Sequence, residues 1–167
     1  GNVLADLGVE RGDRVALLFP NEVAYLYAFF GAARLGAVPV PVNVQTPTET
    51  MAYVVEDAGA TVAVTSARES IRAEAAEIAG RVDGLGTVGV VGADGTDAVA
   101  AAAPDAVRVL DFSAAVADAP ADLDPVPVSP DDPALQPYTS GSTGRPKGVV
   151  LSHGGTDWNV TTVRQVH

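Results

Sequence analysis

The chain has 167 residues, of which 47% are hydrophobic and 19% are charged, a composition typical of one soluble globular domain with a real core. Its 21 acidic residues against 10 basic ones give a net charge of −11, which argues against binding to nucleic acid or to an anionic membrane surface. There is no cysteine, so disulfides and thiolate metal sites are excluded, and the two histidines are too few to suggest a metal cage. No apolar run approaches the roughly 20 residues that a transmembrane helix needs, and nothing at the N-terminus resembles a signal peptide. We therefore expect a cytoplasmic location without a transmembrane segment.

The first part of the chain predicts a helix followed by a strand. Leu4 and Leu7 lie at helical spacing and Gly8 follows them, so we expect a helix that this glycine ends. The apolar run 15–19 predicts a short buried strand that ends at Pro20.

Residues 22–35 predict a longer helix, with Asn21 as its N-cap and Gly36 at its end. We interpret its aromatic side chains as core residues: Tyr25, Tyr27, Phe29 and Phe30. Beyond this helix, Pro39 and Pro41 remove backbone donors, so the segment that contains them is expected to be an edge strand or an extended stretch.

The middle of the chain continues the alternation of helices and strands. A helix over 48–58 is expected, with Thr48 as its cap and Gly59 as its end. The elements expected next are a strand over 61–66, a helix over 67–82, strands over 87–92 and 107–111, and weaker helices between 93 and 119. Strands separated by helical patterns predict an α/β fold with a largely parallel sheet flanked by helices.

The composition changes over residues 120–133, which hold five prolines and four aspartates. Such a stretch cannot be a helix, so we expect a solvated, extended connection within the domain. Near the C-terminus, a strand over 149–151 and a helix that begins at Thr156 or Asp157 are expected. Because the sequence begins and ends inside helical patterns, we expect it to be part of a larger protein.

Residues 138–150, YTSGSTGRPKGVV, form a short loop rich in glycine and hydroxyl residues between apolar segments. Glycine permits positive φ, so successive backbone N–H groups can converge on an anion, and hydroxyl side chains add donors. Lys147 adds a compact positive charge on a long side chain, which suits a phosphate. The residues favour a phosphate-binding loop, with an ordinary surface turn as the alternative.

Two well-known phosphate loops do not match this stretch. A Walker A loop needs Gly-Lys followed by Ser or Thr, whereas Lys147 lies between Pro146 and Gly148. A Rossmann fingerprint opens a helix after the first strand, whereas these glycines lie late in the chain and lead into a strand.

The loop resembles the signature motif of the adenylate-forming superfamily, which includes acyl-CoA synthetases, adenylation domains and luciferases. Residues 138–148 fit that motif without a gap, and residues 8–43 and 49–65 resemble the segments that precede it in the family. The resemblance implies an incomplete N-terminal AMP-binding domain over residues 1–167, with the C-terminal domain absent. It also implies that the phosphates of ATP are held by one set of residues: Thr139, Ser140, Gly141, Ser142, Thr143, Gly144 and Lys147.

The resemblance further implies an activity, in which ATP, Mg²⁺ and a carboxylic acid, most simply a fatty acid, give an acyl-adenylate that is passed to coenzyme A. No residue of the chain is an evident nucleophile or general base, so the chain alone is expected to be inactive. An adenylation domain of a peptide synthetase and an acyl-AMP ligase are enzyme alternatives. A non-catalytic truncated α/β module, able to self-associate through exposed apolar surface, is an alternative of another class. His153 is interpreted as a hydrogen-bonded residue at the head of a helix and Trp158 as a core residue.

Overall fold

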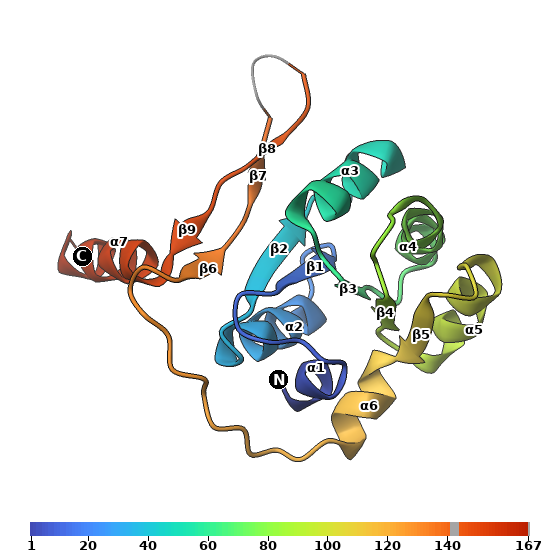
Figure 1. Cartoon of the computed structure of the whole chain (residues 1–167), viewed down its shortest axis with the longest axis horizontal. Coiled ribbons are helices and arrows are strands. Elements are labelled where there is room, and N and C mark those ends of the chain that lie inside the picture. The colour runs from blue at the N-terminus through green and yellow to red at the C-terminus, as the bar shows by residue number, and fades with distance from the viewer. Residues whose placement is uncertain (141–143, 167) are drawn as a thin grey trace.

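The computed structural model describes residues 1–140 and 144–166, with side chains described as far as Thr162. Its centre is a five-stranded sheet in the order β2-β1-β3-β4-β5, in which all neighbours are parallel (Figure 1). These strands are β1 Arg14–Leu18, β2 Val38–Val42, β3 Val62–Thr65, β4 Thr87–Val90 and β5 Arg108–Asp111. The helices are α1 Asn2–Asp6, α2 Val23–Arg34, α3 Thr48–Ala58, α4 Glu69–Arg81, α5 Ala93–Ala102, α6 Phe112–Asp118 and α7 His153–Val166. The α/β fold with a parallel sheet is therefore confirmed.

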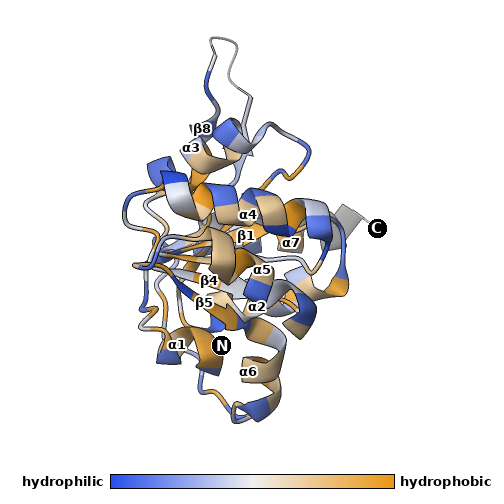
Figure 2. Cartoon of the chain, turned by 90° about the vertical axis from the view of Figure 1, so that its right-hand side faces the viewer, coloured by the Kyte–Doolittle hydropathy of each residue, from blue (hydrophilic) through white to orange (hydrophobic). Residues whose placement is uncertain are grey.

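Helices cover both faces of the sheet, because alternate residues of each strand point to opposite faces. Ala16 and Leu18 of β1 are buried with residues of α3, α4 and α5 on one face. Val15 and Leu17 are buried with residues of α1, α2 and α6 on the other face. Figure 2 shows the hydrophobic strands lying between the helices. The apolar run read as a buried strand is thus buried on both sides.

Strand β2 forms one edge of the sheet, as its prolines predict. The strand order places β2 and β3 on opposite sides of β1, so the chain reverses direction across the sheet after β2. In such sheets, ligands bind outside the carboxyl ends of the strands near the reversal. A ligand site is therefore expected at the segments that follow β1 and β2.

Helix α2 corrects two predictions made from the sequence. Its N-cap is Glu22 rather than Asn21, and no side chain caps the helix. Tyr27 and Phe30, which we interpreted as core, are 71% and 60% exposed. The reason is that the fully buried residues of α2 are small, Ala28, Gly31 and Ala32, while Tyr25 and Phe29 are only partly buried against the same core. Periodicity cannot identify the buried face of a helix that is apolar on every side. The expected self-association through exposed apolar surface stays a prediction.

The C-terminal part also differs from expectation. Helix α7 begins at His153, not at Thr156 or Asp157, because the Ser152 hydroxyl accepts a hydrogen bond from the N–H of Gly155 at 3.2 Å and so acts as the N-cap. Trp158 on this helix is 67% exposed and is not a core residue.

Of the strand expected over 149–151, only Leu151 lies in a strand, because the chain here forms two short antiparallel pairs with a break between them. Strands β7 Tyr138–Thr139 and β8 Lys147–Gly148 form one pair, and β6 Pro133–Leu135 and β9 Leu151–Ser152 form the other. Val149 and Val150 belong to neither pair; the N–H of Val149 donates to the carbonyl of Pro137 at 2.9 Å.

The Pro/Asp-rich segment 120–133 is irregular up to β6, as expected, and Asp132 links it to both ends of the chain. The Asp132 carboxylate accepts hydrogen bonds from the N–H of Ser129 at 2.6 Å and from the guanidinium of Arg11 at 2.5 Å. Its carbonyl accepts from the N–H of His153 at 2.9 Å. His153 thus begins a helix with its backbone N–H hydrogen-bonded, as interpreted from the sequence, whereas its ring Nε2 is buried without a hydrogen-bond partner among the described residues.

These contacts predict a pH dependence of stability. The Ser129 N–H, followed by the charges of Arg11 and His153, lowers the pKa of Asp132 below its usual 3.8. A carboxyl whose pKa is lower in the folded state stabilises the fold above its unfolded pKa and loses this effect as pH falls. We therefore expect Asp132→Asn to be less stable than the wild type near neutral pH. The difference in unfolding free energy should shrink below about pH 3.8, in denaturant titrations across pH. A difference that stays constant down to acid pH would contradict this reading.

Candidate functional site

The β7–β8 hairpin carries the glycine-rich loop and extends beyond α3 in both views (Figures 1 and 2). In its ladder, Tyr138 pairs with Gly148 and Thr139 pairs with Lys147. Cross-strand partners project on the same face of an antiparallel ribbon, so the side chains of Thr139 and Lys147 lie next to each other. Two residues that the sequence assigned to phosphate are therefore brought together at the base of the loop.

The other predicted site residues fall into two groups. Ser140 follows Thr139 and is exposed, and Gly144 on the return side is exposed with φ of 122°, a conformation that glycine adopts most readily. Gly141, Ser142 and Thr143 lie outside the described residues, so the amide cradle expected over 141–144 stays a prediction.

The base of the hairpin is attached to the body by side-chain hydrogen bonds around Tyr138. The Tyr138 hydroxyl donates to a carboxylate oxygen of Asp57 on α3 at 2.7 Å, and the Gln136 amide donates to the same hydroxyl at 3.2 Å. Partial burial, followed by the hydrogen bond to Asp57, raises the pKa of Tyr138 above its usual range. The phenol therefore remains protonated and remains a donor to Asp57.

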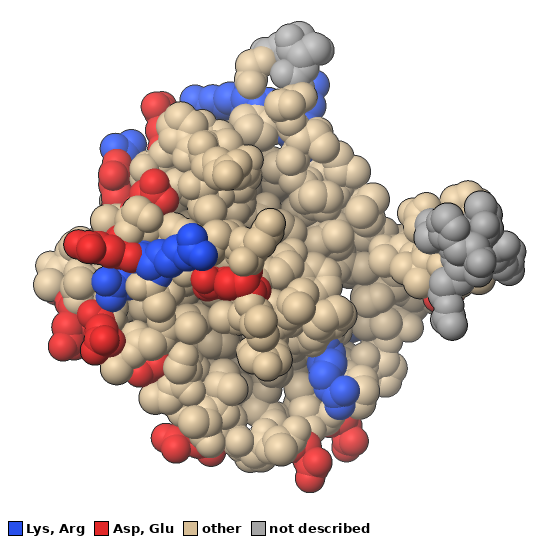
Figure 3. Space-filling model, turned by 180° about the vertical axis from the view of Figure 1, so that it is seen from behind, with Lys and Arg blue, Asp and Glu red and all other residues tan. Residues whose placement is uncertain are grey.

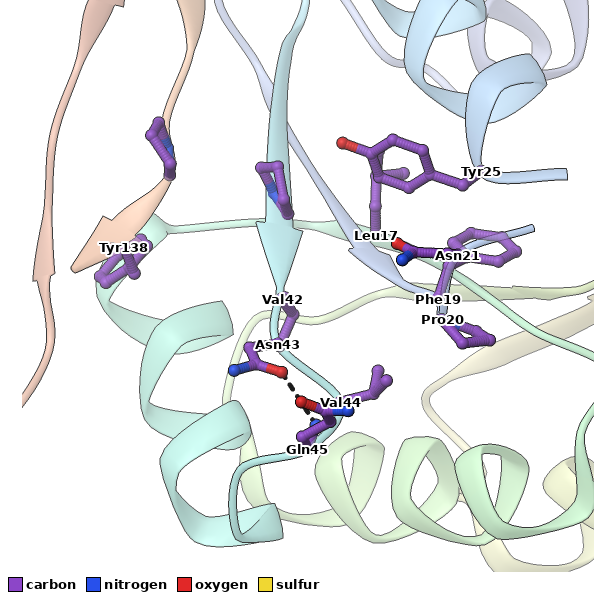
Figure 4. Close-up of a pocket in the computed structure, with 12 residues that line it drawn as sticks. Leu17, Phe19, Pro20, Asn21, Tyr25, Val42, Asn43, Val44, Gln45 and Tyr138 are labelled. Atoms are coloured by element: carbon purple, nitrogen blue, oxygen red, sulfur yellow. Dashed lines mark hydrogen bonds between the residues drawn. The ribbon is translucent and has the colours of Figure 1, made fainter. Parts of the chain in front are cut away.

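Two pockets flank this base. One, of about 430 Å³, lies between the end of β2, α3 and the hairpin, and its lining includes Asn43, Thr50, Thr139 and Ser140. The second, of about 500 Å³, lies at the carboxyl ends of β1 and β2 (Figure 4). Its labelled lining residues are Leu17, Phe19, Pro20, Asn21, Tyr25, Val42, Asn43, Val44, Gln45 and Tyr138.

Asn43 and Tyr138 line both pockets, so the two pockets meet at the base of the hairpin. The Asn43 side chain is oriented by a hydrogen bond from the N–H of Gln45 at 3.0 Å, drawn dashed in Figure 4. The combined hollow lies where the strand order predicts a ligand, outside the carboxyl ends of strands beside the reversal.

Positive charge gathers at the hairpin in a chain that is acidic overall. Lys147 is the only lysine of the sequence; it lies in β8, Arg145 lies just before β8, and both are exposed. Figure 3 shows Lys and Arg atoms beside the grey loop tip, with most acidic atoms elsewhere on that face. Among residues 1–140 and 144–166, no group of three or more acidic or histidine side chains is arranged to hold a metal ion. In the same residues, no helix is long and apolar enough to cross a membrane.

Sequence reasoning missed Asp57 as part of the site. It lies 81 residues before Tyr138, and nothing in a single sequence connects the two. The one local signal is the four-residue spacing of Tyr53 and Asp57, whose side chains are hydrogen-bonded on the surface of α3 at 3.2 Å.

Comparison with known proteins gives a consistent set of relatives. Residues 1–167 match a family described as AMP-binding enzyme. The chain is 39% identical over 152 residues to the long-chain-fatty-acid–CoA ligase FadD13 of Mycobacterium tuberculosis, covering 91% of the chain and 27% of the relative. It is 38% identical over 162 residues to a feruloyl-CoA synthase of Amycolatopsis sp., covering 97% of the chain and 28% of the relative. The chain thus spans just over a quarter of the length of these curated relatives.

Solved structures agree with these relatives. The inhibitor-bound N-terminal domain of FACL13 from Mycobacterium tuberculosis superposes with a TM-score of 0.71 at 35% identity, over 91% of this chain and 34% of that one. The anthranilate CoA ligase AuaEII in complex with anthranoyl-AMP gives a TM-score of 0.79 at 27% identity, over 96% of this chain and 28% of that one.

Proposed function

Because the chain belongs to the family of AMP-binding enzymes, we propose that the complete protein is an ATP-dependent acyl-CoA ligase whose phosphate-binding loop lies in the β7–β8 hairpin. In this proposal, residues 1–167 supply part of the N-terminal domain. The observation that carries the proposal is the pairing of Lys147 with Thr139 at the base of the hairpin. The two pockets described above, at the carboxyl ends of β1 and β2, flank this base. The resemblance to CoA ligases supports it.

The reaction has two steps. A carboxylate oxygen of the acid attacks the α-phosphorus of ATP, the bond between the α- and β-phosphates breaks, and pyrophosphate leaves. The thiol of coenzyme A then attacks the acyl carbon, AMP leaves, and the thiol proton passes to solvent or to a base. A carboxylate is a poor electrophile, so the first step activates it for the second.

The residues of the hairpin fit the first step. The Lys147 ammonium would neutralise charge that develops on the departing pyrophosphate, and the hydroxyls of Thr139 and Ser140 would donate to phosphate oxygens. Gly144 would let the backbone approach the phosphates closely, together with Gly141, Ser142 and Thr143. We propose that Mg²⁺ arrives bound to the phosphates of ATP, where it shares the neutralisation of charge.

The acid substrate is proposed at the level of a class. The similarity to FadD13 supports a fatty acid, and the similarity to feruloyl-CoA synthase supports an aromatic acid. We propose a fatty acid for the complete protein, with aromatic acids as the comparison in the assay. We expect the 167-residue chain by itself to bind ATP without forming the adenylate.

Calorimetric titration of the chain with Mg·ATP, Mg·pyrophosphate and AMP tests this proposal. If the loop holds the β- and γ-phosphates, Mg·ATP and Mg·pyrophosphate should bind and compete with each other. AMP lacks those phosphates and should bind at least about 10-fold more weakly, since the charge-assisted hydrogen bonds to the hairpin are lost. Equal binding of AMP and ATP, or no binding of any of the three, would contradict the proposal and favour a non-catalytic module.

A further inference from the structure

Helix α3 contacts both sides of the glycine-rich loop. On the incoming side, the Tyr138 hydroxyl donates to one carboxylate oxygen of Asp57, as described above. On the return side, the guanidinium of Arg145 lies over the ring of Tyr53, 5.0 Å from its centroid, in a cation–π contact. A pocket of about 260 Å³ lined by Tyr53, Gly144 and Arg145 lies at this second contact. The two contacts are joined, because the Tyr53 hydroxyl donates to the other carboxylate oxygen of Asp57 at 3.2 Å.

Asp57 is exposed and occupies a position that is mildly unfavourable for a carboxylate. It lies in the last turn of α3, where the partial negative charge of the helix C-terminus repels a carboxylate. Two phenol donors, from Tyr53 and Tyr138, compensate this repulsion. A residue that is unfavourable for its own helix but bonded by Tyr53 and Tyr138 is explained by those contacts rather than by the stability of α3.

Gly148 makes room for the Tyr138 contact. A Cβ at this position would lie 3.1 Å from Cζ and 3.2 Å from the hydroxyl of Tyr138, and 2.9 Å from the amide nitrogen of Gln136. The absence of a side chain therefore lets the Tyr138 ring lie against the β8 backbone and reach Asp57. The glycine at position 148 therefore has a packing role that is separate from phosphate binding.

We propose that Asp57, Tyr53 and Tyr138 are positioning residues that hold both ends of the phosphate loop on α3, and that this attachment sets the affinity of the loop for the pyrophosphate group. The inference rests on the proposed function. A loop whose ends are already fixed loses less conformational entropy when it orders around a ligand, so its affinity is higher.

The test measures the affinity for Mg·pyrophosphate by calorimetry in single and double variants. Tyr138→Phe removes one oxygen and should weaken binding about 10-fold, the effect of one hydrogen bond to a charged group. Asp57→Ala should weaken it by a similar factor, and the double variant should be no weaker than Asp57→Ala, because both changes break the same contact. Asp57→Asn keeps an oxygen that accepts from Tyr138, and should retain affinity within about threefold of the wild type. Tyr27→Phe, at an exposed tyrosine of α2, is the matched control and should change nothing.

Two further variants separate the contact of Arg145 with Tyr53 from that of Tyr138 with Asp57. Tyr53→Phe keeps the ring under Arg145, whereas Tyr53→Leu removes it, so the second should weaken binding more than the first. Thermal melts of each variant check that it folds. If Tyr138→Phe binds pyrophosphate like the wild type while Lys147→Ala does not, the attachment proposal is wrong and the proposed function stands. If Asp57→Asn loses as much affinity as Asp57→Ala, the hydrogen bond from Tyr138 to residue 57 does not set the affinity, and the attachment proposal is wrong. A wild-type protein that binds neither pyrophosphate nor ATP overturns both proposals together.

Discussion

Lys147→Ala is expected to lower the affinity for Mg·pyrophosphate about 100-fold, the upper range for a hydrogen bond between charged groups. In the complete protein it should slow ATP–pyrophosphate exchange by a similar factor, because the same ammonium would stabilise charge on the departing group. The effect should be large because Lys147 pairs with Thr139 at the base of the loop, whereas Arg145, the neighbouring cation of the hairpin, lies over the ring of Tyr53. Calorimetry measures the first effect and isotope exchange the second.

Arg81→Ala is the matched control for this change. Arg81 is an exposed cation in the last turn of α4, paired with Glu77, and helix α3 lies between α4 and the hairpin (Figure 1). Its removal lowers the net charge by the same amount and should leave pyrophosphate affinity nearly unchanged, since exposed charges beyond a Debye length are screened. Equal losses in the two variants would indicate a general charge effect, and an unchanged Lys147→Ala would contradict the role assigned to this residue.

Phe112→Ala is expected to produce the largest loss of stability, about 3–5 kcal/mol. Phe112 begins α6, is only 7% exposed, and belongs to the core that joins α1 and α2 to the sheet. Its removal leaves a cavity that the rigid strands cannot fill by relaxation. Chemical denaturation measures the change, and Val116→Ala on the exposed side of the same helix should cost less than about 0.5 kcal/mol.

Phe112 lies against Gly89, so a substitution of Gly89 tests the same packing. A Cβ on Gly89 of β4 would lie 2.9 Å from Cδ2 of Phe112, so Gly89→Ala should destabilise by about 1–3 kcal/mol through overpacking. Combined with Phe112→Ala, the added methyl group enters the vacated space. The double variant should therefore be more stable than the sum of the two losses predicts. Strict additivity would show that the two residues do not share this space.

The architecture followed from the sequence because its signals were local and consistent. The apolar run 15–19, the prolines of β2 and Gly59, which adopts φ of 67° at the end of α3, each specify one element, and all agree with a parallel sheet. Serine is a favoured N-cap residue, so Ser152 was a local signal for the start of α7, three residues before the expected one. The buried face of α2 was beyond prediction, since its fully buried residues are small and its aromatic residues are divided between the core and the surface.

The candidate site was partly predictable. The glycine-rich stretch indicated a phosphate loop, and the structure brings Thr139 and Lys147 of that stretch together. The attachment of the loop to α3 was not predictable, because Asp57 and Tyr138 meet only through the fold. The roles of Gly141, Ser142 and Thr143 remain predictions from the resemblance.

The single lysine offers a direct measurement of the central claim, that the base of this hairpin contacts a pyrophosphate group. Reductive methylation with ¹³C-formaldehyde labels the Lys147 ammonium while keeping its charge. On titration with Mg·pyrophosphate, the Lys147 methyl signal should shift and saturate at the calorimetric dissociation constant. Saturable binding of pyrophosphate with an unmoved Lys147 signal would show that the ligand binds elsewhere and would contradict the account.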